Sequence, residues 1–127
     1  MSVIPDDLKY TAEHEWVRIE DGVAVIGITD HAQDALTDIV WIEFLADEGD
    51  AVQGNAAFAS VESVKSVSEI FVPLDGTITA MNLGLQDAPE AINEDAYAAW
   101  IVKMELDDVS ALDALLDAAG YAALIGE

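Results

Sequence analysis

Short apolar runs rich in β-branched and aromatic residues alternate with polar turns along most of the chain. Residues 16–19 and 23–26 form two such runs, and Glu20-Asp21-Gly22 between them is typical of a β-hairpin turn. Residues 39–44 are apolar at most positions, which predicts a strand that is buried on both faces. The remaining expected strands span residues 56–61, 67–72, 77–81 and 100–106. This pattern predicts a mainly β protein.

Two helical segments are expected besides the strands. Thr29 has the side chain of a helix N-cap and Asp30 is a first-turn acid, so a short helix is expected from there to about Thr37. Ser110 is expected to cap a second segment, in which the leucines of residues 112–116 recur at helical spacing. The apolar pattern continues towards the C-terminus, so we expect this segment to pack back onto the strands.

The chain has the length of one domain and is strongly acidic. Of its 127 residues 53% are hydrophobic, and 26 acidic residues against four basic ones give a formal charge of −22. This charge argues against binding to nucleic acid or to an anionic membrane surface. It favours partners with basic docking patches, although it could equally serve only to keep the protein in solution. Because there is no cysteine, the chain has no disulfide, thiol nucleophile or cysteine metal site.

The beginning of the chain resembles neither a secretory signal nor an organellar transit peptide. Residues 1–7 lack a basic and an apolar region, and the longest apolar run, residues 96–102, is too short to span a membrane. We therefore expect the protein to be cytoplasmic in a bacterium or archaeon. If the chain is a mature eukaryotic protein, the mitochondrial matrix is expected instead.

Lys65 stands at the centre of a symmetric pattern, Val61-Glu62-Ser63-Val64-Lys65-Ser66-Val67-Ser68-Glu69. An apolar run, a polar turn and a second β-prone run predict a tight hairpin with this lysine at its tip. A lysine there is exposed, rigidly supported and open on several sides to an enzyme that attaches a covalent cofactor. An isolated lysine on a turn would be only a solvated residue, so the flanking sequence decides between the two interpretations.

Glu62-Ser63-Val64-Lys65 closely resembles the lipoyl-attachment site of the glycine cleavage H-protein family. Other segments resemble the same family and follow its order: Leu8-Lys9-Tyr10, His14-Glu15-Trp16-Val17, residues 27–33, residues 38–40, residues 72–76, Trp100-Ile101-Val102-Lys103 and residues 121–127. Each segment alone is short. Their order and spacing cover nearly the whole chain and make the resemblance specific.

The fold that the resemblance implies is a small barrel-sandwich hybrid of the lipoyl and biotinyl type, mainly β with short helices. It implies a single lipoyl-carrier domain over residues 1–127, with the barrel-sandwich at about residues 10–106 and C-terminal helices at about residues 108–126. A minimal lipoyl domain would end before these helices, so the C-terminal segment favours the H-protein family over its shorter relatives.

The function that the resemblance implies is that of a lipoyl carrier in glycine catabolism and one-carbon metabolism, not of an enzyme. Lipoate bound as an amide to Lys65 would take the aminomethyl group of glycine from a pyridoxal-phosphate glycine decarboxylase. It would pass the methylene group to tetrahydrofolate on an aminomethyltransferase, and dihydrolipoyl dehydrogenase would reoxidise the dithiol. These enzymes and the lipoate-attaching enzymes are the implied partners of a monomer. The sequence contains no Ser-His-Asp order, phosphate-binding glycine loop or cofactor fingerprint of its own.

Three glutamates acquire candidate roles from the same resemblance. Glu62 matches a residue by which the attaching enzymes recognise the lysine. Glu15 matches a carboxylate that pairs with the cationic amine when the loaded arm folds into a surface cleft, a task that suits a charge-assisted hydrogen bond. Glu69 matches an acidic position close to the arm. The plain alternatives are that Glu62 and Glu15 are ordinary surface residues, and that Glu69 only balances the charge of Lys65.

Four further residues bear on the expected cleft and on the helix beside it. His14 and His31 could suggest a metal, but no third ligand stands at a recognisable spacing. His31 follows a helix N-cap and either lines the cleft or only caps and packs, while Glu13 could place a second carboxylate near the cleft. Thr37 stands where the family usually has glycine. A left-handed backbone there would cost a β-branched residue about 1–2 kcal/mol.

Other functions remain compatible with these residues. In the same scaffold, the chain could be a lipoyl-relay protein that donates its lipoyl group to other acceptor proteins. A biotin-carrying domain is disfavoured, because such domains usually have Ala-Met-Lys-Met around the lysine and Lys65 lacks this pattern. The least specific alternative is an acidic, β-rich interaction module in which Lys65 carries no modification.

Overall fold

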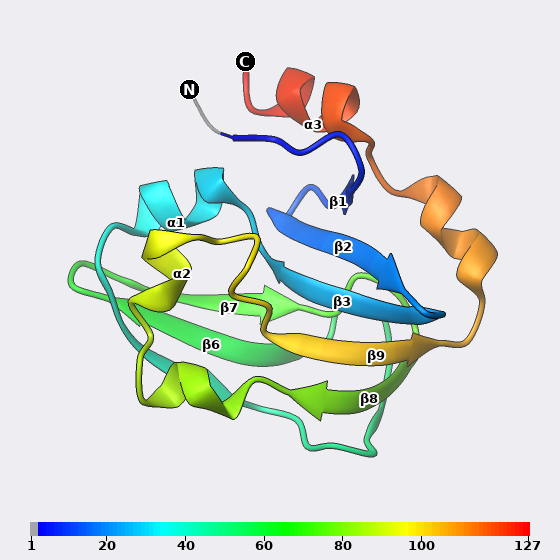
Figure 1. Cartoon of the computed structure of the whole chain (residues 1–127), viewed down its shortest axis with the longest axis horizontal. Helices are drawn as coiled ribbons and strands as arrows, with labels where there is room; N and C mark the ends of the chain where they lie inside the picture. The colour runs from blue at the N-terminus through cyan, green and yellow to red at the C-terminus, as the bar shows by residue number, and fades with distance from the viewer. Residues whose placement is uncertain (1–2) are drawn as a thin grey trace.

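Two antiparallel sheets pack against each other, with short helices around their edges (Figure 1). The computed structural model describes residues 3–127. The larger sheet contains, in spatial order, β1 (Lys9–Tyr10), β2 (Glu15–Glu20), β3 (Val23–Ile28), β9 (Val102–Leu106), β8 (Gly76–Met81) and β5 (Ala51–Val52). The smaller sheet contains β4 (Ile39–Phe44), β6 (Ala57–Ser63) and β7 (Val67–Phe71). This arrangement confirms the prediction of a mainly β, barrel-sandwich-like fold.

The turn between β2 and β3 has the backbone that its sequence predicts. Glu20 pairs with Val23, which leaves Asp21 and Gly22 as the two turn residues. Both have positive φ, 51° and 80°. Positive φ at both central positions defines a type I′ turn, whose twist matches that of the flanking strands.

The prediction that residues 39–44 are buried on both faces is wrong, and a β-bulge explains why. Ile39 pairs with Ser63 and Trp41 pairs with Glu62, so Val40 is an extra residue on β4. A bulge re-aims the side chains that follow it. Val40 and Trp41 are consequently 50% and 44% exposed on the outer face of the smaller sheet, whereas Ile39 and Ile42 remain buried.

The helix predicted at Thr29 is confirmed. The hydroxyl of Thr29 accepts the Ala32 N–H at 3.2 Å and caps α1 (Asp30–Leu36). The sequence pattern predicts neither the 3₁₀ helix η1 (Leu83–Gln86) nor α2 (Ala91–Glu94). Figure 1 shows α2 beside α1, at the end of the protein where the β6–β7 turn lies.

The C-terminal segment is helical in two pieces, but the prediction that Ser110 is its N-cap is wrong. Asp108 is the cap of a 3₁₀ helix, η2 (Val109–Ala114), because its carboxylate accepts the Ser110 N–H at 3.0 Å. The chain is then extended at Leu116, which pairs with Tyr10. Asp117 caps α3 (Ala118–Leu124), so two aspartate caps divide the segment into two short helices.

Two buried clusters hold the sheets and α3 together. Along β3, Ala24 and Ile26 face the cluster between the two sheets, whereas Val25 faces a second cluster on the outer side of the larger sheet. Tyr10 and Tyr121 belong to this second cluster and stack at 4.8 Å between ring centroids. The packing explains why α3 returns to lie over the N-terminal segment (Figure 1). Along residues 3–127, no helix has the length and apolar character that crossing a membrane would require.

Thr37 ends α1 in a backbone conformation that favours glycine. Its φ is 66° and its ψ is −147°, a region that side chains with a Cβ rarely adopt. The Thr37 N–H donates to the Gln33 carbonyl at 2.9 Å, and the Thr37 carbonyl accepts from Asn93 Nδ2 at 2.8 Å. These bonds from both sides hold the residue in a strained geometry.

We expect Thr37→Gly to stabilise the protein by about 1 kcal/mol, because relief of a strain of about 1–3 kcal/mol exceeds the extra chain entropy of glycine. Urea unfolding of the two proteins measures the change. Thr37→Ala is the matched control, because alanine keeps the Cβ and therefore the strain. Equal stabilities of the glycine and alanine variants would contradict the assignment of strain to this backbone.

Candidate functional site

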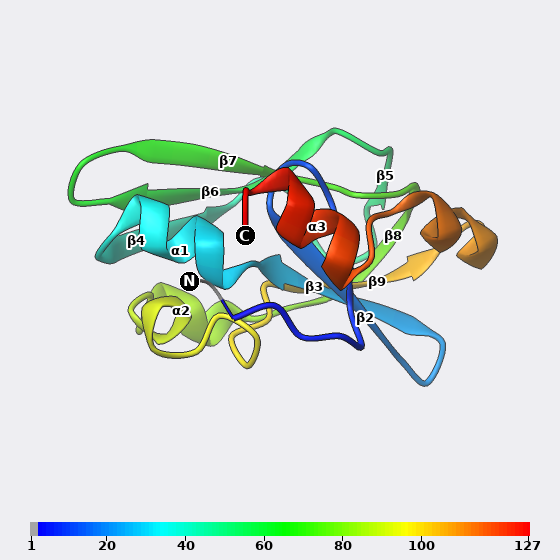
Figure 2. The ribbon, with the colours of Figure 1, turned by 90° about the horizontal axis from the view of Figure 1, so that it is seen from above.

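Lys65 lies in a turn that is organised by a buried serine. Glu62 and Val67 form the last pair of the β6–β7 ladder. Ser63 is 5% exposed, and its N–H donates to the Ser66 carbonyl at 2.8 Å while its Oγ accepts the Ser66 N–H at 3.1 Å. The Lys65 side chain is exposed. In both ribbon views the turn projects from the body of the protein (Figure 1 and Figure 2).

The side chain of Glu62 faces the solvent beside this turn. Trp41, Glu62 and Val67 lie opposite one another on three neighbouring strands, so their side chains share the outer face of the smaller sheet. All three are exposed. Any protein that grips Lys65 from the outer side of the hairpin would therefore meet a carboxylate between two apolar side chains.

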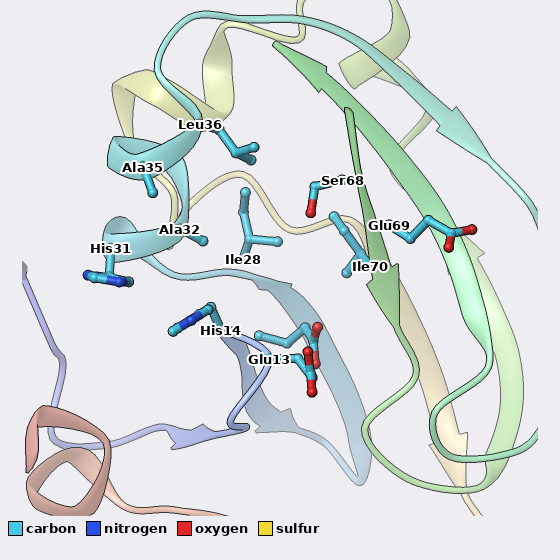
Figure 3. A pocket seen from close by; sticks show the side chains of 11 residues that line it. Glu13, His14, Ile28, His31, Ala32, Ala35, Leu36, Ser68, Glu69 and Ile70 are labelled. Carbon is cyan, nitrogen blue, oxygen red and sulfur yellow. The ribbon is translucent and has the colours of Figure 1, made fainter. Parts of the chain in front are cut away.

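A cleft of about 170 Å³ opens on the other side of the hairpin, between α1, β7 and the turn before β2 (Figure 3). It is lined by Glu13, His14, Glu15, Ile28, His31, Ala32, Ala35, Leu36, Ser68, Glu69 and Ile70. Ser68 lies three positions after Lys65 on the strand that leads out of the turn. At about 3.3 Å per residue, the cleft therefore begins roughly 10 Å from the lysine backbone.

Glu15 is the buried charged residue of this cleft, at 2% exposed. The Thr11 hydroxyl donates to its Oε1 at 2.7 Å, and the Phe71 N–H donates to its Oε2 at 3.4 Å. Burial raises the pKa of Glu15 to about 7, although the two hydrogen bonds act in the opposite direction and lower it. The alternative that Glu15 is an ordinary surface residue is therefore wrong, and its carboxyl group titrates close to neutral pH.

Two histidines line the cleft next to Glu15. The rings of His14 and His31 lie 4.9 Å apart between centroids, and both contribute to the lining. The open question about His31 is thus answered: it lies at the cleft. Among residues 3–127 no group of three His, Cys, Asp or Glu side chains could hold a metal ion. Burial and, next, the neighbouring His31 lower the pKa of His14.

Glu69 contributes to the lining of the cleft, but its carboxylate points away. Figure 3 shows Ser68 and Ile70 directed towards Ile28 and Leu36, and Glu69 directed to the opposite side of β7. This is the alternation expected along a strand. The carboxylate of Glu69 therefore lies on the outer face of the smaller sheet, opposite Ser60.

The cleft also contains residues that the sequence does not single out. Ala32 and Leu36 line it from α1 because positions four apart share a helix face. Ser68 and Ile70 line it from β7 because alternate residues share a strand face. Both spacings can be read from the sequence, but the juxtaposition of α1 with β7 is a tertiary contact that leaves no local signal.

The raised pKa of Glu15 predicts a pH dependence of stability with a definite sign. Its folded-state pKa of about 7 lies above the ordinary glutamate value of 4.5, so the folded state holds the proton more tightly. The contribution of Glu15 to stability is therefore largest at low pH and falls as the pH rises from 4.5 to about 7. We expect the free energy of unfolding of the unsubstituted protein, relative to that of Glu15→Gln, to fall by about 3 kcal/mol over this range. Urea unfolding of both proteins at several pH values measures this difference in unfolding free energy. A difference that does not change with pH would refute the prediction.

The comparisons with known proteins agree on one family. The sequence model of the glycine cleavage H-protein family matches residues 8–127. The glycine cleavage system H protein of Azoarcus sp. is 50% identical, with 100% of both chains covered. That of Acidobacterium capsulatum is 47% identical, over 97% of this chain and 95% of the relative. A crystal structure of a glycine cleavage system H protein from Mycobacterium marinum superimposes with a TM-score of 0.88 at 35% identity, covering 98% of this chain and 100% of that chain. The chain therefore belongs to the glycine cleavage H-protein family, a family of carriers rather than enzymes.

Proposed function

We propose that this chain is the lipoyl carrier of a glycine cleavage system, with lipoate attached to the Nζ of Lys65 as an amide. The observation that carries the proposal is the placement of Lys65. It is exposed at the tip of a projecting hairpin whose turn is held by Ser63, within the Glu62-Ser63-Val64-Lys65 segment that resembles the family's attachment site. The hairpin displays the lysine, and Glu62 marks it for the attaching enzymes.

The cleft fits both parts of a loaded lipoyl arm. Lipoate on Lys65 would supply a dithiol able to carry the aminomethyl group of glycine from a pyridoxal-phosphate glycine decarboxylase to an aminomethyltransferase, and dihydrolipoyl dehydrogenase would reoxidise it. Ile28, Leu36 and Ile70 give the cleft apolar walls suited to a hydrocarbon stem. The carboxylate of Glu15 lies at the same cleft and suits a cationic amine.

Glu15 is the group that we propose binds the cargo. Its two oxygens accept hydrogen bonds from the Thr11 hydroxyl and the Phe71 N–H, and these bonds fix the orientation of the carboxylate. A carboxyl group with a pKa of about 7 can lose its proton when an ammonium group arrives beside it. The resulting ion pair is partly shielded from water, so it would hold the amine away from hydrolysis.

The distribution of charge suits docking to proteins with basic patches. Lys9, Arg18 and Lys103 all lie on strands of the larger sheet, where Arg18 pairs with Glu20 and Lys103 lies over the ring of Trp100. The smaller sheet with its hairpin carries Lys65 as its one basic side chain. Once Lys65 is acylated, that surface has no positive charge and favours encounter with basic partner surfaces.

The attachment is tested by the intact mass of protein made in its own host, with peptide mapping around Lys65. We expect a lipoyl-sized addition on Lys65, none in Lys65→Arg, and full modification of the control Lys103→Arg, which changes a lysine of the larger sheet. Unmodified Lys65 in cells that lipoylate other proteins would refute the proposal. Rescue of a glycine-cleavage mutant by the modified protein is also expected, and failure of that rescue would favour the relay function instead.

The role of Glu15 is tested by the lifetime of the aminomethyl-loaded carrier. We expect Glu15→Gln to shorten this lifetime about tenfold, because a neutral amide loses roughly 1.4 kcal/mol of charge-assisted hydrogen bonding to the amine, and to leave lipoylation unchanged. Glu69→Gln is the matched control, since its carboxylate points away from the cleft (Figure 3). If loaded Glu15→Gln lived as long as the loaded unsubstituted protein, the proposed role of Glu15 would be refuted.

A further inference from the structure

Three side chains from distant parts of the sequence form one hydrogen-bonded chain behind the cleft. His14 Nδ1 lies 2.8 Å from the Tyr121 hydroxyl, which lies 2.8 Å from the Thr29 hydroxyl. The Thr29 hydroxyl also accepts the Ala32 N–H at 3.2 Å, and the Thr29 N–H donates to the His14 carbonyl at 3.0 Å. The C-terminal helix, the start of α1 and the cleft wall are therefore joined through polar contacts.

The burial of Thr29 fixes the direction of this chain. Its side chain is 0% exposed, so water cannot satisfy it, and its hydroxyl carries one proton to donate. One neighbour, the Ala32 N–H, is a donor and cannot accept that proton. The oxygen of Tyr121 is then the acceptor, which obliges the Tyr121 proton to go to His14 Nδ1. A neutral His14 consequently carries its own proton on Nε2.

Protonation of His14 would disrupt this arrangement. A second proton, on Nδ1, would point at the Tyr121 oxygen, so Tyr121 could no longer donate there. Either Tyr121 or Thr29 would then hold a buried hydroxyl proton without an acceptor, which is unfavourable. The network therefore opposes the cationic form of His14 by a route that is separate from simple burial.

The other surroundings of His14 also oppose its cationic form, with the exception of Glu13. His31 on α1 faces the ring at 4.9 Å, and, after burial, it lowers the pKa of His14, whereas Glu13 raises it. Glu15 lines the same cleft, and Tyr121 faces the ring from α3. The φ of His14 is 70°, an uncommon value for a non-glycine residue, and the bonds to Thr29 and Tyr121 hold it there.

We propose that Tyr121 and Thr29 are positioning residues that keep His14 neutral, in its Nε2–H form, at the wall of the cleft. The inference rests on the proposed function, because a cleft that receives a cationic amine beside Glu15 must not carry a cationic imidazole on its wall. A neutral ring leaves the attraction between Glu15 and the amine unopposed. The C-terminal helix thereby belongs to the arm site, although none of its residues lines the cleft.

The test is the protonation state of His14, followed by 15N NMR of the imidazole nitrogens across the pH range in the protein without lipoate. We expect the Nε2–H form in the unsubstituted protein. Tyr121→Phe keeps the ring and its stack on Tyr10 but removes the hydroxyl. In this variant we expect the pKa of His14 to rise by about half a unit or more, and both neutral tautomers to appear.

Two variants separate this effect from general destabilisation. Tyr10 stacks on Tyr121, and its hydroxyl donates to the Pro5 carbonyl rather than to His14. Tyr10→Phe removes that hydroxyl, and we expect this variant to leave the pKa and the tautomer of His14 unchanged. Thr29→Ser keeps the hydroxyl and should preserve the Nε2–H form. An Nδ1–H form in the unsubstituted protein, or an unchanged His14 in Tyr121→Phe, would overturn the proposal. This NMR measurement needs no lipoyl group, so its result does not depend on whether lipoate is attached to Lys65.

Discussion

The chain can fold only if nearly all of its carboxylates remain in water, and this constraint governs the whole structure. With 26 acidic and four basic residues, nearly every carboxylate lacks a cation to neutralise it, and burying an unpaired charge is costly. Among residues 3–127 the buried polar or charged side chains are Glu15, Thr29 and Ser63. Ser63 lies under the Lys65 turn, Thr29 begins α1, and Glu15 lies at the cleft. Each of these three residues is thus found at a place that the proposed carrier function uses.

Strand β7 connects the display of Lys65 with the cleft. It leads directly out of the Lys65 turn, lines the cleft through Ser68 and Ile70, and ends at Phe71, whose N–H contacts Glu15 on β2. The buried carboxylate therefore connects β2 of the larger sheet with β7, an edge strand of the smaller sheet. Lys65 lies in the turn two positions before this strand begins, so a short, directly connected segment joins the attachment point to the cleft.

Local signals in the sequence predict what local chemistry determines. The Asp21-Gly22 turn, the Thr29 cap and the hairpin around Lys65 each follow from neighbouring residues, and the structure contains all three. The outward turn of Trp41 could not be predicted, because the bulge depends on pairing with β6. The burial of Glu15 and its contact with β7 likewise arise from tertiary packing. At the C-terminus the sequence did contain the signal, since Asp108 and Asp117 are both good caps, but Ser110 competed with them.

The separation of Lys65 and Tyr121 along the chain has a consequence for the order in which the site is made. All strands of the smaller sheet have been synthesised by Phe71, whereas Tyr121 follows much later in the chain. The residues of the hairpin that displays Lys65 are therefore synthesised well before the hydrogen bond behind His14 can exist. Synthesis from N- to C-terminus thus produces Lys65 before the tyrosine that completes the polar contacts behind the cleft. A chain that stops short of residue 121 would contain Lys65 but lack the hydroxyl that lies beside His14 Nδ1.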